Sequence, residues 1–223
     1  MIKAILFDLD GTLIDFFRFK KNACDAAISA MIKAGLKMGK KKALKILFDL
    51  YSKHGIEDPK IFQKFLKKVE GKTNYKYLTY GILAYRKMKE NYMYPYQGTI
   101  ETLKKLKKRY RLAVISDAHG INAWLRLISM KIDNMFDVVL TKSDVRAQKP
   151  SSRVFRKVLK MLKVKPEQAI MVGDRTERDI AGARALGIKT VYARYGDTNK
   201  VKQGASGADF EIDDIRELLR IVK

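Results

Sequence analysis

Short runs of apolar residues alternate with amphipathic stretches along most of the chain, and together they predict its elements. Five runs rich in Ile, Val and Leu predict strands that are buried on both faces. These strands span residues 4–7, 112–115, 136–140, 169–172 and 188–193, and a short edge element begins at Phe210. Apolar positions three or four residues apart predict helices at 99–110, 121–130, 152–162, 179–186 and 213–222. Strands alternating with helices indicate an α/β fold with a doubly wound, Rossmann-like parallel sheet.

Residues 15–95 have a different pattern, because apolar residues recur there only at helical spacing. The first predicted helix begins after Asp15 and stops near Gly35, and the second ends by Gly55. The third opens at Asp58-Pro59 as an N-cap and first helical residue, and the fourth covers about 75–92 before Pro95. Such a block is too long for a simple crossover connection. We therefore expect a parallel core at 1–14 and 96–223 and a four-helix domain at 15–95.

Composition limits the class of protein further. The longest apolar runs are far shorter than the roughly 20 residues that a membrane span needs, so we expect no contact with a membrane. Residues 1–3 lead into the first strand without the layout of a signal peptide. The single cysteine, Cys24, lies among alanines and predicts a buried thiol rather than a disulfide. These features favour a cytoplasmic location.

The chain is strongly basic, with 47 lysines and arginines against 24 acidic residues and a net charge of +23. Such a charge attracts polyanions and phosphorylated small molecules. The lysines are spread over many helices, which is typical of solvated helix faces, and no nucleic-acid-binding motif accompanies them. We expect a small phosphorylated partner rather than nucleic acid, and a monomer or homodimer.

Residues 6–15, LFDLDGTLID, contain the candidate chemistry. Asp8 and Asp10 follow the first buried strand, and two carboxylates so close together repel each other unless a cation lies between them. Mg²⁺ prefers oxygen ligands of this kind. Gly11 allows the backbone to turn sharply, and Thr12 adds a hydroxyl group.

Further polar residues follow the other predicted strands. Ser116-Asp117 ends the second strand, Lys149-Pro150 follows the third, and Gly173-Asp174 ends the fourth, with Asp179 five residues on. Taken alone, Ser116-Asp117 is more typical of a helix N-cap and Lys149-Pro150 of a surface turn, whereas Gly173-Asp174 fits a turn before a helix and a functional site equally well. Parallel strands, however, bring their carboxyl ends to one edge of the sheet. Three carboxylates, a hydroxyl and an ammonium group at one edge predict a metal site beside a phosphate site.

The segment Asp8-Leu9-Asp10-Gly11-Thr12 resembles the first motif of the haloacid dehalogenase-like hydrolases, and the other motifs follow in the family's order. The resemblance implies that Asp8 is the nucleophile, which forms a phosphoaspartate, and that Asp10 is the general acid and base. It also implies that Mg²⁺ binds Asp8, Asp174 and the backbone carbonyl of Asp10. Thr12, Ser116, Asp117 and Lys149 are the predicted phosphate-binding residues. Asp179 is expected to position Lys149 or metal-bound water, and Lys149 to neutralise charge during catalysis.

The resemblance also gives the expected reaction. Asp10 favours a phosphatase, because the family's dehalogenases lack this second aspartate and a leaving halide needs no proton. The helical block falls where the family inserts a cap domain, which selects among small esters such as sugar, triose or glycolate phosphates. A phosphomutase with the same phosphoaspartate and a 2-haloacid dehalogenase are the nearest alternatives. A basic nucleic-acid-binding protein is the alternative from another class.

Overall fold

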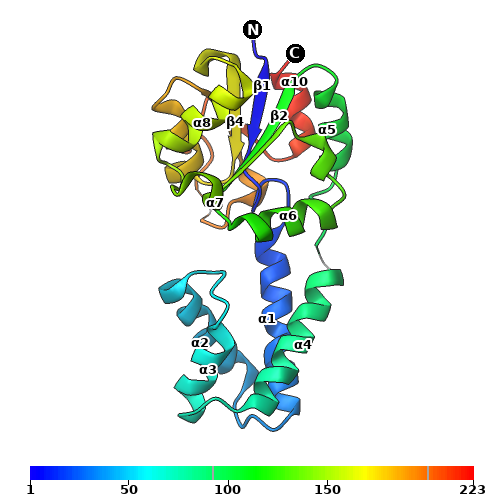
Figure 1. Cartoon of the computed structure of the whole chain (residues 1–223), viewed down its shortest axis with the longest axis vertical. Coiled ribbons are helices and arrows are strands. Elements are labelled where there is room, and N and C mark those ends of the chain that lie inside the picture. Colours follow the sequence, from blue (N-terminus) through cyan, green and yellow to red (C-terminus); the bar gives the residue numbers. More distant parts are fainter. Residues whose placement is uncertain (92, 200) are drawn as a thin grey trace. The chain divides into compact units, whose positions relative to one another are not determined.

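The computed structural model describes residues 1–91, 93–199 and 201–223, and it divides into two compact units (Figure 1). The first unit comprises Met1–Phe17 and Met93–Lys223, and the second comprises Arg18–Tyr92. Tyr92, which was predicted to end the fourth helix, lies outside the described residues. No helix in the described part of the chain is long and apolar enough to cross a membrane.

A parallel sheet forms the centre of the first unit. In the described residues its six strands have the order β3-β2-β1-β4-β5-β6, and every neighbouring pair is parallel. The strands are β1 (Ala4–Phe7), β2 (Arg111–Ser116), β3 (Val138–Thr141), β4 (Ala169–Gly173), β5 (Lys189–Ala193) and β6 (Phe210–Ile212). This is the order of a doubly wound fold, and it reverses between β1 and β4. The predicted fold class is confirmed.

Helices cover both faces of this sheet, because its strands are apolar on both sides. Alternate residues of a strand point to opposite faces. Leu6 and Ile115 pack with Phe155 of α8 (Ser152–Leu162) in one core cluster, which leaves Ile5 and Phe7 for the other face. Both faces are dry, since all four residues of β1 are fully buried. The central strands are therefore held in one register, and the residues at their carboxyl ends are placed accurately.

The helices of the first unit follow the predicted pattern with local differences. They are α5 (Thr99–Lys107), α6 (Gly120–Ser129), α7 (Lys142–Val145), α8 (Ser152–Leu162), α9 (Ala181–Arg184) and α10 (Leu218–Ile221). The predicted helix 179–186 is instead a π-helical turn, Thr176–Ile180, followed by the short α9. The predicted helix 213–222 begins as a 3₁₀ turn, Ile215–Glu217, which the side chain of Asp214 caps. The short α7 was not predicted.

The second unit has its own apolar core. Its helices are α1 (Phe16–Lys33), which starts in the first unit, α2 (Lys40–His54), α3 (Ile61–Glu70) and α4 (Tyr75–Asn91). Cys24 is buried in this core, as expected, beside residues such as Leu47 and Phe65. Helix α3 begins at Ile61 rather than at Pro59, because the Asp58 side chain accepts a hydrogen bond from the amide of Lys60 in a turn before the helix. No strand occurs among the described residues of this unit.

Candidate active site

The candidate site lies at the carboxyl edge of the sheet, where the strand order reverses. Asp8 directly follows β1, Asp174 directly follows β4, and Ser116 is the last residue of β2. The amide of Asp8 donates a hydrogen bond to the carbonyl of Val172 at 2.9 Å, which extends the β1–β4 pairing to the first residue of the site. The crevice at such a switch point is where ligands bind in open α/β sheets.

Lys149 is the centre of a buried ion-pair cluster. Its Nζ pairs with the Asp8 carboxylate and with Oδ1 of Asp179 at 2.7 Å, and it donates to the carbonyl of Ile115 at 3.0 Å. Burial alone would lower the pKa of Lys149, but Asp179 and Asp8 raise it above its ordinary value. Lys149 is therefore a fixed positive charge beside Asp8.

Three buried carboxylates surround this point. Asp8, Asp174 and Asp179 can each offer one oxygen within 4.8 Å of the others. Burial raises the pKa of Asp174, and the charges of Asp8 and Asp179 raise it further. Oδ2 of Asp174 accepts no hydrogen bond among the described residues. It forms an ion pair with Nε of Arg175 at 3.3 Å. An all-oxygen cluster with surplus negative charge fits a hard divalent cation such as Mg²⁺.

Gly11 fits this cluster because it lacks a side chain. Its φ of +93° is rare for other residues, and a Cβ there would lie 2.4 Å from Asp174 Oδ2. The hydroxyl of Thr12 lies 3.5 Å from Asp174 Oδ1, and its carbonyl accepts a hydrogen bond from Tyr195 at 2.8 Å. The DGT segment is thus folded tightly around Asp174.

Ser116 and Asp117 lie at the same edge but make different contacts. Ser116 is buried, and its Oγ accepts a hydrogen bond from the amide of Ala118 at 3.1 Å. Asp117 Oδ1 accepts from the amide of Lys149 at 2.9 Å, and Oδ2 pairs with Arg178 at 3.0 Å. The structure therefore gives the Asp117 carboxylate a role in holding the Lys149 loop, although Asp117 was predicted to bind phosphate.

Asp10 has a partner that sequence reasoning missed. Its Oδ2 lies 3.0 Å from Nη1 of Arg126, a buried residue of α6, and the guanidinium stacks 4.5 Å from the ring centre of Phe16. The Asp10 side chain is outside the carboxylate cluster of Asp8. The sequence held one signal for this contact. Arg126 lies on the apolar face of the predicted helix 121–130, and a buried arginine needs a partner.

Asp179 is oriented by the irregular turn that contains it. The π-helical turn after Asp174 brings Oδ2 of Asp179 to 3.1 Å from the amide of Arg175, while Oδ1 pairs with Lys149. Burial raises the pKa of Asp179, and Lys149 opposes this effect. π-Helical turns occur frequently at functional sites. Asp8, Lys149 and the Asp174–Asp179 segment are brought together, although these three parts are far apart in the sequence.

The site thus combines a parallel α/β fold with buried carboxylates and a lysine at the point where the strand order reverses. A model of the family described as haloacid dehalogenase-like hydrolase matches residues 5–193. The chain belongs to this family, which confirms the resemblance seen in its motifs.

Relatives with curated descriptions match the whole chain. The chain is 37% identical to a glyceraldehyde 3-phosphate phosphatase of Methanocaldococcus jannaschii, over all of this chain and 98% of the relative. It is 34% identical to the protein of the same description from Pyrococcus furiosus, over all of this chain and 93% of the relative. Among solved structures, a protein of Bacillus subtilis described as a HAD-hydrolase bound to magnesium has a TM-score of 0.74 and 20% identity. It is covered over 99% of its length and this chain over 100%, and it shares the fold.

Proposed function

We propose that this protein is a magnesium-dependent phosphatase that hydrolyses a small phosphorylated metabolite, with glyceraldehyde 3-phosphate as its substrate. The observation that carries the proposal is the contact of Lys149 with both Asp8 and Asp179, beside Asp174 and at the end of β1. The relatives described as glyceraldehyde 3-phosphate phosphatases match the full length of the chain and support the choice of substrate.

In this proposal Asp8 is the nucleophile. Its carboxylate oxygen attacks phosphorus, the ester P–O bond breaks, and a phosphoaspartate forms. Lys149 holds the carboxylate in place and offsets the negative charge of the entering phosphate. Asp179 keeps the ammonium group oriented from its other side. The buried position of these groups strengthens each interaction, because little water competes.

Asp10 supplies the proton transfers. It protonates the leaving alkoxide, and it then removes a proton from the water that attacks the phosphoaspartate and restores Asp8. The buried hydroxyl of Ser116 would bind the transferring phosphoryl group, and Thr12 would support the metal ligand Asp174. Arg126 sets the direction of the Asp10 carboxylate.

Asp8, Asp174 and the carbonyl of Asp10 would hold the magnesium ion. When bound, the ion would lower the repulsion between these carboxylates and an incoming phosphate dianion. The helical unit Arg18–Tyr92, inserted between β1 and the rest of the core, would act as the cap that selects the organic part of the substrate.

A phosphate-release assay tests the proposal. Glyceraldehyde 3-phosphate, glycolate phosphate and hexose phosphates are compared at equal concentration, with Mg²⁺ and with EDTA. We expect the highest kcat/KM for glyceraldehyde 3-phosphate with Mg²⁺ and no turnover with EDTA. A higher kcat/KM for a hexose phosphate would refute glyceraldehyde 3-phosphate as the preferred substrate. Full activity in EDTA would refute the metal-dependent reaction.

A further inference from the structure

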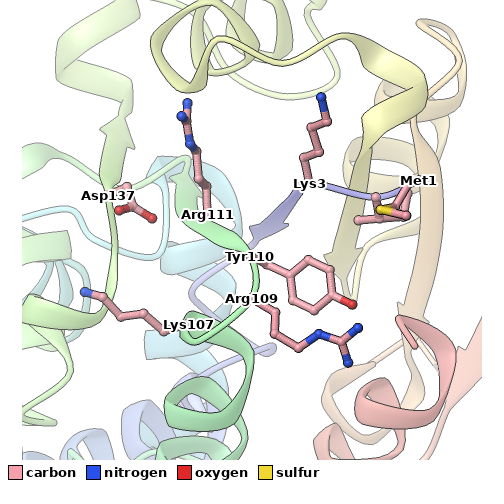
Figure 2. Close-up of a pocket in the computed structure, with 8 residues that line it drawn as sticks. Met1, Lys3, Lys107, Arg109, Tyr110, Arg111 and Asp137 are labelled. Atoms are coloured by element: carbon pink, nitrogen blue, oxygen red, sulfur yellow. The ribbon is translucent and has the colours of Figure 1, made fainter.

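A second concave site lies at the opposite edge of the sheet, where β1 and β2 begin. Its volume is about 460 Å³ (Figure 2). The residues that matter for its chemistry are Lys3, Lys107, Arg109, Tyr110, Arg111 and Asp137. Since β2 runs from Arg111 to Ser116 at about 3.3 Å per residue, this pocket is about 15 Å or more from the candidate active site. It is a separate site.

The pocket has a strong excess of positive charge. Four cationic side chains and one carboxylate line it, and no ion pair involves any of the four among the residues that the structure describes. The carboxylate, Asp137, accepts a hydrogen bond from the amide of Leu112 at 2.8 Å, so it holds the start of β2. The described contacts therefore leave an excess of positive charge in this pocket.

Two of these cations have backbones in contact. The amide of Arg111, the first residue of β2, donates to the carbonyl of Lys3, which directly precedes β1, at 3.0 Å. Figure 2 shows their side chains extending in a similar direction. Like charges held near each other repel, which costs stability. A bound anion would remove this cost.

Two of the four cationic side chains are held in place by backbone carbonyl groups. Lys107 Nζ donates to the carbonyl of Asn134, and the guanidinium of Arg111 donates to the carbonyl of Leu162. Neutral carbonyl groups fix these side chains without removing their charge. Cations that are already fixed lose less conformational entropy when a ligand binds.

We propose that this pocket binds a small molecule with two or more linked phosphate groups. Its volume is in the range of small-molecule sites, about 300–1,000 Å³. Arginine matches phosphate oxygens in a bidentate geometry, and several cations match a chain of several phosphates. A nucleic acid would need cations along an extended track, whereas these surround one concavity.

The test measures binding of inorganic tripolyphosphate by calorimetry. The full chain is used with EDTA present, at a fixed ionic strength of about 0.1 M because salt screens such contacts. The variant Lys3→Gln/Arg109→Gln removes two charges whose side chains hold no backbone carbonyl among the described contacts. The control Lys67→Gln/Lys68→Gln removes two exposed charges from α3 in the other unit.

We expect saturable binding to the wild type, at least tenfold weaker binding to Lys3→Gln/Arg109→Gln, and little change in the control. Equal weakening in both variants, or no saturable binding, would overturn the proposal. ATP is the second probe. An affinity equal to that of tripolyphosphate would show that the phosphate chain is recognised, and a higher affinity would indicate an additional contact with the base. Tighter binding of a single-stranded 20-mer that also depends on Lys3 and Arg109 would assign the pocket to nucleic acid instead. None of these readouts requires phosphatase turnover.

Discussion

At the scale of single residues, the site is packed so closely that small substitutions would displace its charged side chains. Gly11 lies so close to Asp174 that one methyl group would occupy the place of a carboxylate oxygen. Lys149 contacts two carboxylates at once, and Arg126 reaches Asp10 from an apolar helix. Charge and space at this edge are therefore matched side chain by side chain.

Gly11→Ala should abolish magnesium-dependent phosphatase activity, because the new Cβ would displace Asp174. Gly187→Ala is the matched control, since Gly187 also has a positive φ but nothing lies within 4 Å of its added Cβ. Both variants lose about 1–2 kcal/mol from the left-handed backbone, measured by urea unfolding. Equal activity in the two variants would show that the contact with Asp174 is unimportant.

Asp10→Asn should lower kcat for glyceraldehyde 3-phosphate by about 10²–10⁴-fold, because an amide cannot protonate the leaving alkoxide. With p-nitrophenyl phosphate, the rate of phosphoaspartate formation should fall much less, because its phenolate leaves without a proton. A rapid-mixing assay of the first turnover measures this step. A similar loss for both leaving groups would mean that Asp10 is not the acid.

Arg126→Met should lower kcat for glyceraldehyde 3-phosphate about tenfold or more with little change in KM, because Asp10 loses the group that orients it. Arg126→Lys keeps a positive charge and should recover part of the rate. Steady-state kinetics of both variants measure the effect. A rise in KM alone would indicate that Arg126 binds substrate rather than orienting Asp10.

At the scale of elements, the parallel sheet was predictable and the turns after its strands were not. The runs at 4–7 and 169–172 have the apolar character that only a doubly covered sheet explains, and both strands formed as predicted. The helix predicted at 179–186 became a π-helical turn, because Asp179 must face both Lys149 and the amide of Arg175. Such a requirement comes from contacts distant in sequence, which local periodicity does not record.

The connection between β5 and β6 depends on an ionised carboxylate. Asp209 accepts hydrogen bonds from the amide and hydroxyl of Thr190 at 2.7 and 2.8 Å. Burial alone would raise the pKa of Asp209, but these hydrogen bonds lower it below its ordinary value of 3.8. The stabilisation is therefore complete above about pH 4 and is lost as the pH falls through the lower pKa of the folded protein.

Asp209→Asn should reduce the free energy of unfolding at pH 7 by up to about 1 kcal/mol, because hydrogen bonds to a charged group are strong but water screens this exposed carboxylate. The difference from the wild type should shrink below pH 4. Urea unfolding at both pH values measures it, with the exposed Asp49→Asn as a control for charge. A difference independent of pH would contradict the role of ionisation.

At the scale of the whole molecule, the residues proposed for catalysis are distributed over the core unit, and a metal would connect them. Motif order predicted that Asp8, Lys149 and Asp174 meet, and the structure brings them together. Arg126 was missed, and the carboxylate of Asp117 faces Lys149 and Arg178, because such pairings depend on how α6 and the turns pack. A small part of the +23 charge lines the pocket at the other edge, as four cationic side chains beside one carboxylate.

Magnesium should raise the unfolding temperature of the wild type. Binding to the folded state alone contributes about 2.7 kcal/mol at a hundred times Kd, or about 5–10 °C for a chain of this size. Asp174→Asn should lose most of this shift, since it removes a predicted ligand from the cluster. Calorimetric scans with magnesium and with EDTA measure it. An equal shift in the variant would place the ion elsewhere.

The most direct test of the account is chemical trapping of a phosphorylated Asp8. Asp10→Asn is mixed with p-nitrophenyl phosphate, quenched in acid, reduced with borohydride and digested for mass spectrometry. The account predicts homoserine at position 8, because reduction of a phosphoaspartate yields that residue, and none without substrate. Nitrophenol release with an unmodified Asp8 would contradict it.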